Sequence, residues 1–159
     1  MLCTNKHHAS ALTLGILVGL IGPAKAFTAY VSNEKSNTVS VVDTDRMETV
    51  KTIKVGQRPR GIELTKDDRY CLVAVGDDDT IQVIDTKSGE VIANLPSGPD
   101  PELFILSPNG KVLYVHTAGS TIDLFDAQTF RHLRTVTLNA DMAGFVVLPP
   151  PRPASSADR

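Results

Sequence analysis

The chain has 159 residues, of which 42% are hydrophobic and 21% charged, a balance typical of a folded globular protein and not of a disordered one. Its formal net charge is −2, and its 16 lysines and arginines are scattered along the chain, which gives no electrostatic basis for binding nucleic acid. The length suffices for one ordinary domain.

The first 26 residues have the pattern of a secretory signal peptide. A weakly basic start precedes an uncharged apolar run over 11–21, and Gly22-Pro23 ends that run. Ala24-Lys25-Ala26 then offers small residues at the two positions that a signal peptidase reads. The apolar run is too short for a bilayer, which needs about 20 residues. We therefore expect cleavage after Ala26, a periplasmic or secreted mature protein, and no membrane attachment after cleavage.

Cleavage would leave the mature protein with one cysteine, Cys71, because Cys3 lies in the leader. A single thiol cannot form an internal disulfide, so packing alone must hold the domain together. Cys71 lies within an apolar run, which favours a buried and unreactive thiol.

Residues 27–148 contain a phrase that returns every 41 or 42 residues. It reads Thr38-Val-Ser-Val-Val-Asp43, then Thr80-Ile-Gln-Val-Ile-Asp85, then Thr121-Ile-Asp-Leu-Phe-Asp126. A fixed period of this length is typical of repeat architectures.

Each period contains short runs rich in Val, Ile, Leu and Thr that are bounded by Gly, Pro, Asn and Asp, which is the pattern of short strands joined by turns. The predicted strands cover, in chain order, 29–32, 38–43, 50–55, 61–65, 70–75, 80–85, 91–95, 102–107, 112–117, 121–126, 132–138 and 143–148. Four short antiparallel strands per repeat form the blade of a β-propeller. The sequence thus predicts an all-β fold built from four-stranded antiparallel propeller blades.

Asp43, Asp85 and Asp126 end the third strand of each repeat. A residue that recurs in every repeat is expected to serve the fold, because a catalytic residue would usually break the repeat. Aspartate side chains accept hydrogen bonds from the backbone of the turn that follows them. We interpret these three residues as structural turn caps.

Several phrases resemble the YVTN family of β-propeller repeats. They are Tyr30-Val-Ser-Asn33, Asn37-Thr-Val-Ser-Val-Val-Asp43, Thr52-Ile-Lys-Val-Gly56 and Leu106-Ser-Pro-Asn-Gly-Lys111. The phrase Asp77-Asp-Asp-Thr-Ile-Gln-Val-Ile-Asp85 also resembles a secreted subgroup associated with pyrroloquinoline-quinone (PQQ)-dependent alcohol catabolism. The resemblance covers nearly all of residues 28–138 and implies the propeller fold, but it implies no reaction, because this family is largely one of repeat scaffolds.

In that family's usual strand order, A to D from the axis outward, the chain begins with strands B, C and D. Two complete sets follow, and a lone A strand over 143–148 ends the repeats. Closed propellers have about 4 to 8 blades, and this chain supplies roughly three. Residues 149–159 are rich in proline and have the composition of a disordered tail.

Three interpretations of the missing blades remain open. The chain is a truncated segment of a longer propeller, or two or more chains assemble a ring in which each lone A strand joins a neighbour's first blade, or the blades form an open stack. An open stack exposes a sheet edge and an apolar blade face, both of which favour association.

The loops that lead from one repeat to the next form the best candidate binding region, because such loops surround the mouth of a propeller's channel. One loop carries Arg58 and Arg60, and the equivalent loop carries Asp100 and Glu102. The two loops would place opposite charges around one rim. The alternative is that Gly and Pro only shape the turns and that the charges are solvated.

Other chemistry has weak support in the sequence. The chain has no tryptophan, no Cys-x-x-Cys-His haem motif, no Gly-x-Ser-x-Gly motif and no phosphate-binding loop. Asp77-Asp78-Asp79 fits a solvated hairpin tip better than a calcium site. His116 and His132 have no further ligands near them in sequence, whereas a metal site needs three or four.

We therefore expect no metal, no cofactor and no catalytic residue. The predicted function is a secreted, non-catalytic scaffold or accessory factor with a protein partner, linked by resemblance alone to PQQ-dependent alcohol oxidation. The alternative is a fragment of an enzymatic or redox propeller, such as a lactonase-like hydrolase or a cofactor-holding dehydrogenase subunit.

Overall fold

The structure is a computed structural model that describes residues 27–138 and 142–149, so the predicted leader and nearly all of the predicted tail lie outside the described residues. Apart from one 3-10 turn, η1 (Gly76–Asp78), every regular element in the described residues is a β-strand. The strands are β1 (Thr28–Asn33), β2 (Thr38–Asp43), β3 (Glu48–Lys54), β4 (Pro59–Leu64), β5 (Tyr70–Val75), β6 (Thr80–Asp85), β7 (Glu90–Pro96), β8 (Pro101–Leu106), β9 (Val112–Thr117), β10 (Thr121–Asp126) and β11 (His132–Thr137).

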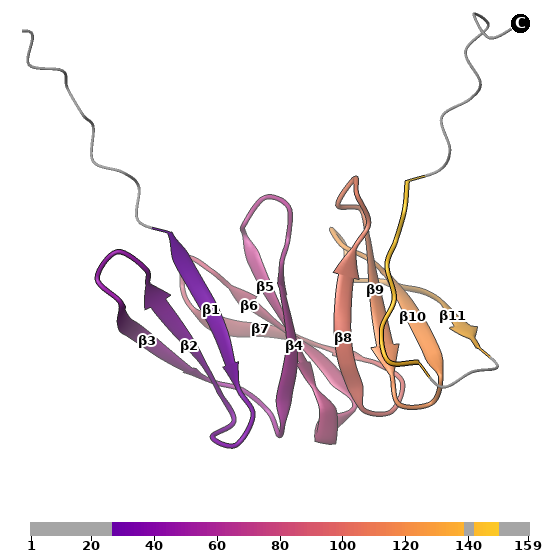
Figure 1. Cartoon of the computed structure of the whole chain (residues 1–159), viewed down its shortest axis with the longest axis horizontal. Helices are drawn as coiled ribbons and strands as arrows, with labels where there is room; N and C mark the ends of the chain where they lie inside the picture. The colour runs from indigo at the N-terminus through magenta and orange to yellow at the C-terminus, as the bar shows by residue number, and fades with distance from the viewer. Residues whose placement is uncertain (1–26, 139–141, 150–159) are drawn as a thin grey trace, which may run out of the picture.

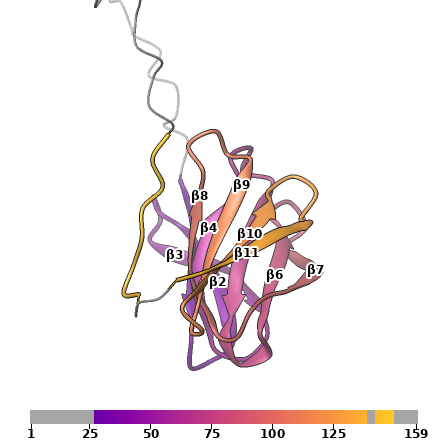
Figure 2. The same ribbon diagram turned by 90° about the vertical axis from the view of Figure 1, so that its right-hand side faces the viewer.

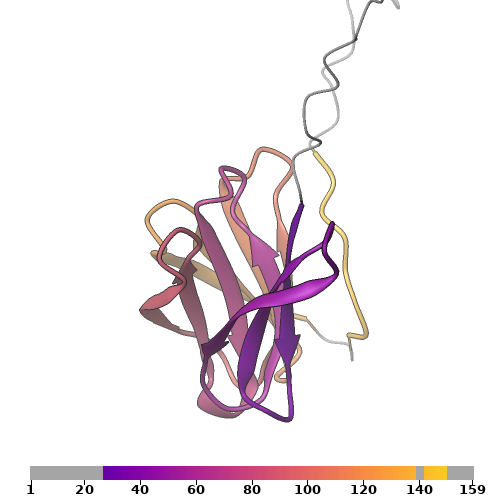
Figure 3. The ribbon, with the colours of Figure 1, turned by 90° about the vertical axis from the view of Figure 1, so that its left-hand side faces the viewer.

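The strands form three antiparallel sheets, which confirms the predicted all-β fold of about three propeller blades. Blade 1 has the order β1-β2-β3, blade 2 the order β4-β5-β6-β7, and blade 3 the order β8-β9-β10-β11. β1, β4 and β8 run side by side across the molecule (Figure 1). Figure 2 shows blade 3 from its own side, and Figure 3 shows blade 1 from the opposite side.

The repeat in the sequence is also a repeat in strand register. Each third strand pairs with the outer strand across a shift in register, located at Val41/Val42, Val83/Ile84 and Leu124/Phe125. Pairing therefore skips one residue of each outer strand: Val50, Ile92 and Leu133. Such bulges bend a strand and turn the extra side chain out of the ladder.

The core consists of two apolar clusters, one between each pair of adjacent blades. β5 contributes to both, with Cys71 and Val73 facing blade 1 and Leu72 and Ala74 facing blade 3. All four side chains are fully buried. This explains why β5 is a continuous apolar run and not an alternating one, since both of its faces are covered.

The thiol of Cys71 is buried, as its sequence context predicts. Burial, with a smaller contribution from the nearby charge of Glu63, raises the pKa of Cys71 to about 12. The thiol therefore stays protonated at neutral pH and is a poor nucleophile.

The strand predicted over 143–148 does not form in the single chain. Residues 142–149 form no strand, and Val146 and Leu148 are 82% and 79% exposed. A β-strand needs a partner edge for its backbone groups. The segment, drawn in yellow, lies on the β8 side of the molecule, and β4 and β8 separate it from the edge strand β1 (Figure 1).

No helix in residues 27–138 and 142–149 is long and apolar enough to cross a membrane.

Candidate functional site

The four charged residues predicted for the rim come together as two ion pairs. Nη2 of Arg58 lies 2.7 Å from Oδ1 of Asp100, and the guanidinium of Arg60 contacts the carboxylate of Glu102. Arg58 and Asp100 end two consecutive inter-blade loops, and Arg60 and Glu102 lie at the starts of the strands β4 and β8 that follow those loops. The opposite charges expected around one rim therefore neutralise each other across the boundary between blades 2 and 3.

Arg58 and Asp100 also share a backbone conformation. Their φ angles are +56° and +47°, in the left-handed region that few residues with a side chain adopt. Hydrogen bonds from outside the loop hold this shape, because the N–H of Arg58 donates to Asn37 over 3.0 Å and its carbonyl accepts from Gly76 over 3.1 Å. The repeat thus extends to the conformation of the loops.

The Asp77-Asp78-Asp79 run forms an exposed tip of the hairpin between β5 and β6, as predicted, and each of its carboxylates also binds a neighbouring loop. Asp77 accepts from Nε of Arg58 over 2.6 Å and, with Asp100, raises the pKa of that guanidinium further above its usual value. Asp78 accepts from the N–H of Gln57 over 3.0 Å, and Asp79 from the N–H of Asp100 over 2.8 Å. Within the described residues, no three His, Cys, Asp or Glu side chains are placed to hold a metal ion.

Asp43, Asp85 and Asp126 have the geometry of turn caps. In each case one oxygen, Oδ1, accepts from the backbone N–H groups two and three residues further on, over 2.8 to 3.0 Å. Hydrogen bonds from the N–H of Ser88 and of Thr129 are the main causes that lower the pKa of Asp85 and Asp126. These contacts fix the turn that leads into each outer strand.

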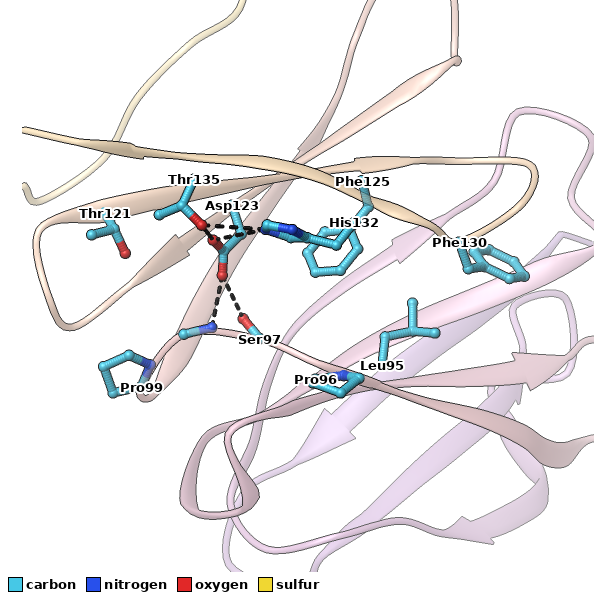
Figure 4. Close-up of a pocket in the computed structure, with 11 residues that line it drawn as sticks. Leu95, Pro96, Ser97, Pro99, Thr121, Asp123, Phe125, Phe130, His132 and Thr135 are labelled. Carbon is cyan, nitrogen blue, oxygen red and sulfur yellow. Dashed lines mark hydrogen bonds and ion pairs between the residues drawn. The ribbon is translucent and has the colours of Figure 1, made fainter.

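A cavity of about 580 Å³ lies between blades 2 and 3 (Figure 4). Its walls are mainly apolar, and its polar residues gather around Asp123 of β10. The lining residues are Leu95, Pro96, Ser97, Gly98, Pro99, Thr121, Asp123, Phe125, Phe130, His132 and Thr135.

Asp123 is only 2% exposed, and both of its oxygens are engaged. Oδ2 accepts from the N–H of Gly98 over 2.7 Å and from Oγ of Ser97 over 3.3 Å. Oδ1 accepts from the hydroxyl of Thr135 and lies 3.3 Å from Nε2 of His132. Burial acts to raise the pKa of Asp123, but the hydrogen bonds from Thr135, Gly98 and His132 together outweigh it and lower that pKa.

The arrangement of Ser97, Asp123 and His132 differs from a catalytic relay. In a Ser-His-Asp triad the imidazole stands between the hydroxyl and the carboxylate, so that it can take the hydroxyl proton. Here the carboxylate stands between the other two, because Ser97 and His132 contact opposite oxygens of Asp123. In this order the group next to the hydroxyl of Ser97 is a weakly basic carboxylate and not the imidazole.

At the junction between blades 1 and 2, an amide side chain takes the place that the carboxylate of Asp123 has between blades 2 and 3. Oε1 of Gln82 accepts from the N–H of Gly56 over 3.0 Å, and its Nε2 donates to Oδ1 of Asn94 over 2.9 Å. Gln82 and Asp123 hold equivalent positions in the repeated phrase, as do Gly56 and Gly98 in the loops. We call this contact of a third-strand side chain with the loop glycine the inter-blade latch.

Sequence reasoning missed the latch. Gln82 and Asp123 lie inside the repeated phrase, but their glycine partners lie 26 and 25 residues earlier, in the preceding loop. The available signal was the polar residue at the third position of each repeated phrase, which is Ser40, Gln82 and Asp123 in turn.

His116 faces Glu102 on the inner side of blade 3. It is 5% exposed, and its Nδ1 lies 3.8 Å from Oε2 of Glu102 without a hydrogen-bond partner in the described residues. Glu102, Arg60 and Glu34 line a smaller cavity of about 400 Å³ beside it.

Solved structures with the same fold include two large proteins. The Kuenenia stuttgartiensis hydrazine synthase matches with a TM-score of 0.68 and 21% identity over 79% of this chain and 40% of that one. Dihydro-heme d1 dehydrogenase NirN in complex with DHE matches with a TM-score of 0.61 and 18% identity over 72% of this chain and 25% of that one. The chain thus spans less than half the length of either protein, and identities this low establish the fold alone.

No curated protein matches the sequence. The model of the YNCE-like β-propeller family matches residues 8–139, a range that includes all three blades. Because this match covers most of the sequence and agrees with the three antiparallel sheets, the chain belongs to the YNCE-like β-propeller family.

Proposed function

We propose that this protein is a non-catalytic β-propeller scaffold or accessory factor that binds a protein partner through the outer strands of its blades. The observation that carries the proposal is a repeated apolar side chain on the perimeter. Val50, Ile92 and Leu133 are the residues skipped at the three bulges, and they are 56%, 51% and 40% exposed. The same position on the outer strand of each blade thus carries an exposed apolar side chain, a repeated pattern that supports a contact surface along the perimeter.

The polar groups of the two other candidate regions serve contacts between blades. Arg58 and Arg60 are neutralised by carboxylates of the next loop. Asp123 has both oxygens engaged and a lowered pKa, which makes it a poor proton acceptor at neutral pH. Contacts within the fold account for the charged residues of these two regions. They do not account for the repeated exposed apolar side chains on the perimeter.

We further propose that the partner belongs to PQQ-dependent alcohol oxidation, on the resemblance to the secreted YVTN-type subgroup. The test is binding of the purified chain to a PQQ-dependent alcohol dehydrogenase, measured by biolayer interferometry. The combined variant Val50→Ser, Ile92→Ser and Leu133→Ser should weaken binding at least about tenfold, because it removes the apolar contact area of three side chains. Leu103→Ser is the matched control, since Leu103 is 43% exposed on the inner strand β8 and not on an outer strand.

Two results would count against this proposal. Equal binding by the combined variant and the wild type would exclude the perimeter as the contact surface. Reduction of a redox dye by the chain alone, with alcohol and PQQ added, would show a catalytic protein.

Export through the predicted leader belongs to the same proposal. Expression of the full sequence in a bacterial host should give a periplasmic product whose first residue is Phe27, as read by N-terminal sequencing. A cytoplasmic product that retains residues 1–26 would contradict it.

A second candidate is a segment of an enzymatic or redox propeller. It is favoured by the two structural neighbours, a hydrazine synthase and a dihydro-heme d1 dehydrogenase, and by the fact that this chain spans only 40% and 25% of those chains. Metal analysis and a visible absorption spectrum of the purified protein separate the two candidates. The scaffold predicts blank results, and stoichiometric haem, quinone or metal would favour the enzyme.

A further inference from the structure

In the part of the chain that the structure describes, the inner edge of blade 1 lacks a strand that the other two blades have. Blades 2 and 3 begin with the inner strands β4 and β8, whereas blade 1 begins with β1, which corresponds to β5 and β9. Among the described residues, β1 pairs only with β2 and forms the free edge of its sheet (Figure 3). Its Val31 is 45% exposed. An unpaired edge presents a row of free backbone donors and acceptors.

The segment over 143–148 carries the sequence of the missing inner strand. Leu64 of β4, Leu106 of β8 and Leu148 are spaced by 42 residues, and so are Ile62, Phe104 and Val146. Ile62 and Leu64 pack into the junction between blades 1 and 2, and Phe104 and Leu106 into the junction between blades 2 and 3. Val146 and Leu148 are instead 82% and 79% exposed, so the segment has the apolar pattern of an inner strand without its environment.

A buried polar atom in blade 3 also indicates that an inner strand is missing beside that blade. In blade 1, Oγ of Ser32 donates to the carbonyl of Arg60 on the next inner strand over 2.6 Å. The register places His116 at the position of Ser32, since His116 pairs with Ile122 as Ser32 pairs with Val39. By the same spacing Gly144 corresponds to Arg60. Nδ1 of His116 is buried without a partner, and an inner strand over 143–148 would offer it the carbonyl of Gly144.

The segment cannot complete blade 1 of its own chain, because β4 and β8 lie between it and β1 (Figure 1). A second copy removes this obstacle. Each chain supplies three sheets, so two chains supply six, within the range of about 4 to 8 blades at which propellers close. A two-fold arrangement would place the segment of each chain against β1 of the other.

We propose that two copies of this chain form a closed six-bladed ring by exchanging the segment 143–148, which becomes the inner strand of the other copy's blade 1. The pairs Ile62/Val73 and Leu64/Cys71 in blade 2 fix the register. Val146 then lies opposite Val31 of the second copy, and Leu148 opposite Ala29 of the second copy. The ring buries both side chains and pairs the open edge of β1. This inference is independent of the proposed function.

The first experiment measures the mass of the protein, expressed with its leader and purified, by light scattering after gel filtration. The expected mass is twice that of one chain at every concentration above the dissociation constant. A monomer mass at every concentration from about 1 µM to 1 mM would overturn the proposal.

The second experiment tests the register by disulfide formation and does not depend on a destabilised variant. Two differently tagged chains, both with Cys3→Ser, are co-expressed, one with Val31→Cys and the other with Val146→Cys. Directly opposed residues of paired strands lie about 4.5 to 5.5 Å apart at Cα, within the range that a disulfide spans. A covalent dimer carrying both tags is expected on a non-reducing gel.

The control pair is Met47→Cys with Val146→Cys, which are both exposed but not opposed in the proposed register. Cross-linking of the control pair to the same extent would overturn the register. In a single chain carrying both Val31→Cys and Val146→Cys, a disulfide within the monomer would overturn the exchange.

The third experiment disrupts the contact. Val146→Lys with Leu148→Lys should convert the dimer to a monomer that retains a β-sheet circular dichroism spectrum, weaker only by the loss of the exchanged strand. Val50→Lys with Ile92→Lys, on the outer strands, should leave the dimer intact. A dimer that survives the first pair of substitutions would exclude the exchanged segment as its basis.

Discussion

The two junctions between blades hold the same loop glycine with different side chains. At the first junction the acceptor is the neutral amide of Gln82, 3.0 Å from the N–H of Gly56. At the second it is the carboxylate of Asp123, 2.7 Å from the N–H of Gly98. A charged acceptor forms shorter and stronger hydrogen bonds than a neutral one, so the second junction has the stronger latch.

The neighbouring residue changes with the latch. The amide of Gln82 has N–H groups to donate, and Asn94 opposite it on β7 supplies an acceptor. A carboxylate can only accept, and Thr135 at the corresponding place on β11 supplies a hydroxyl donor. The comparison shows that the repeat conserves a contact and not a residue, and that a change at one position determines what its cross-strand neighbour must be.

The largest expected effect is that of Asp123→Ala. This substitution leaves the N–H of Gly98 and the hydroxyl of Thr135 without their charged acceptor, and a lost hydrogen bond to a buried charge costs about 2 to 3 kcal/mol. Urea denaturation should show this fall in the free energy of unfolding. Asp123→Asn keeps an acceptor for Gly98 and should lose less. Equal losses for the two variants would contradict the latch.

The next effect is the dependence of the second latch on pH. Because the pKa of Asp123 is lowered in the folded protein, its stabilisation is fully present above the unfolded value of about 3.9 and is lost as the pH falls through the folded pKa. The difference in unfolding free energy between wild type and Asp123→Asn should therefore shrink from pH 5 toward pH 2. A difference that stays constant over this interval would show that the charge of Asp123 is not involved.

Gln82→Ala tests the neutral latch. It should lower the free energy of unfolding by about 1 kcal/mol, because it removes one neutral hydrogen bond to the backbone and one to Asn94 near the surface. A double-mutant cycle with Asn94→Ala should show coupling between the two positions. If Gln82→Ala costs as much as Asp123→Ala, charge is not what distinguishes the junctions.

The smallest expected effect is that of Asp100→Asn, which breaks the ion pair with Arg58 at the rim. Asparagine tolerates the left-handed conformation of this position, so the substitution removes the charge and keeps the loop. The pair is partly exposed, and the loss of stability should be smaller than for Gln82→Ala and should vanish in 1 M salt. A loss that persists at high salt would indicate a role beyond charge pairing.

Much of the fold could be predicted from the sequence because its signals are local and repeated. The strands over 38–43, 70–75, 80–85, 112–117 and 121–126 have the predicted bounds. The segment over 143–148 has the same apolar pattern but forms no strand, because pairing depends on an edge that local sequence does not specify.

The candidate sites were less predictable, for the same physical reason. Arg58, Arg60, Asp100 and Glu102 were identified as rim residues, but not as partners of each other, because the partners lie 42 residues apart. Asp123 was missed because its partners come from the preceding loop and from the strand beside it. Contacts between repeats become visible only once the blades are stacked.

The burial of Cys71 between blades 1 and 2 has a kinetic consequence. A thiol reagent can reach a fully covered, protonated sulfur only when the two blades separate locally. In a protein whose leader has been removed no other thiol competes, so the rate of modification reports how often this junction opens. The reaction rate of Cys71 with a thiol reagent thus measures local opening of the junction between blades 1 and 2. A substitution that weakens the Gln82 latch, which lies at this junction, should increase that rate more than one that weakens the Asp123 latch.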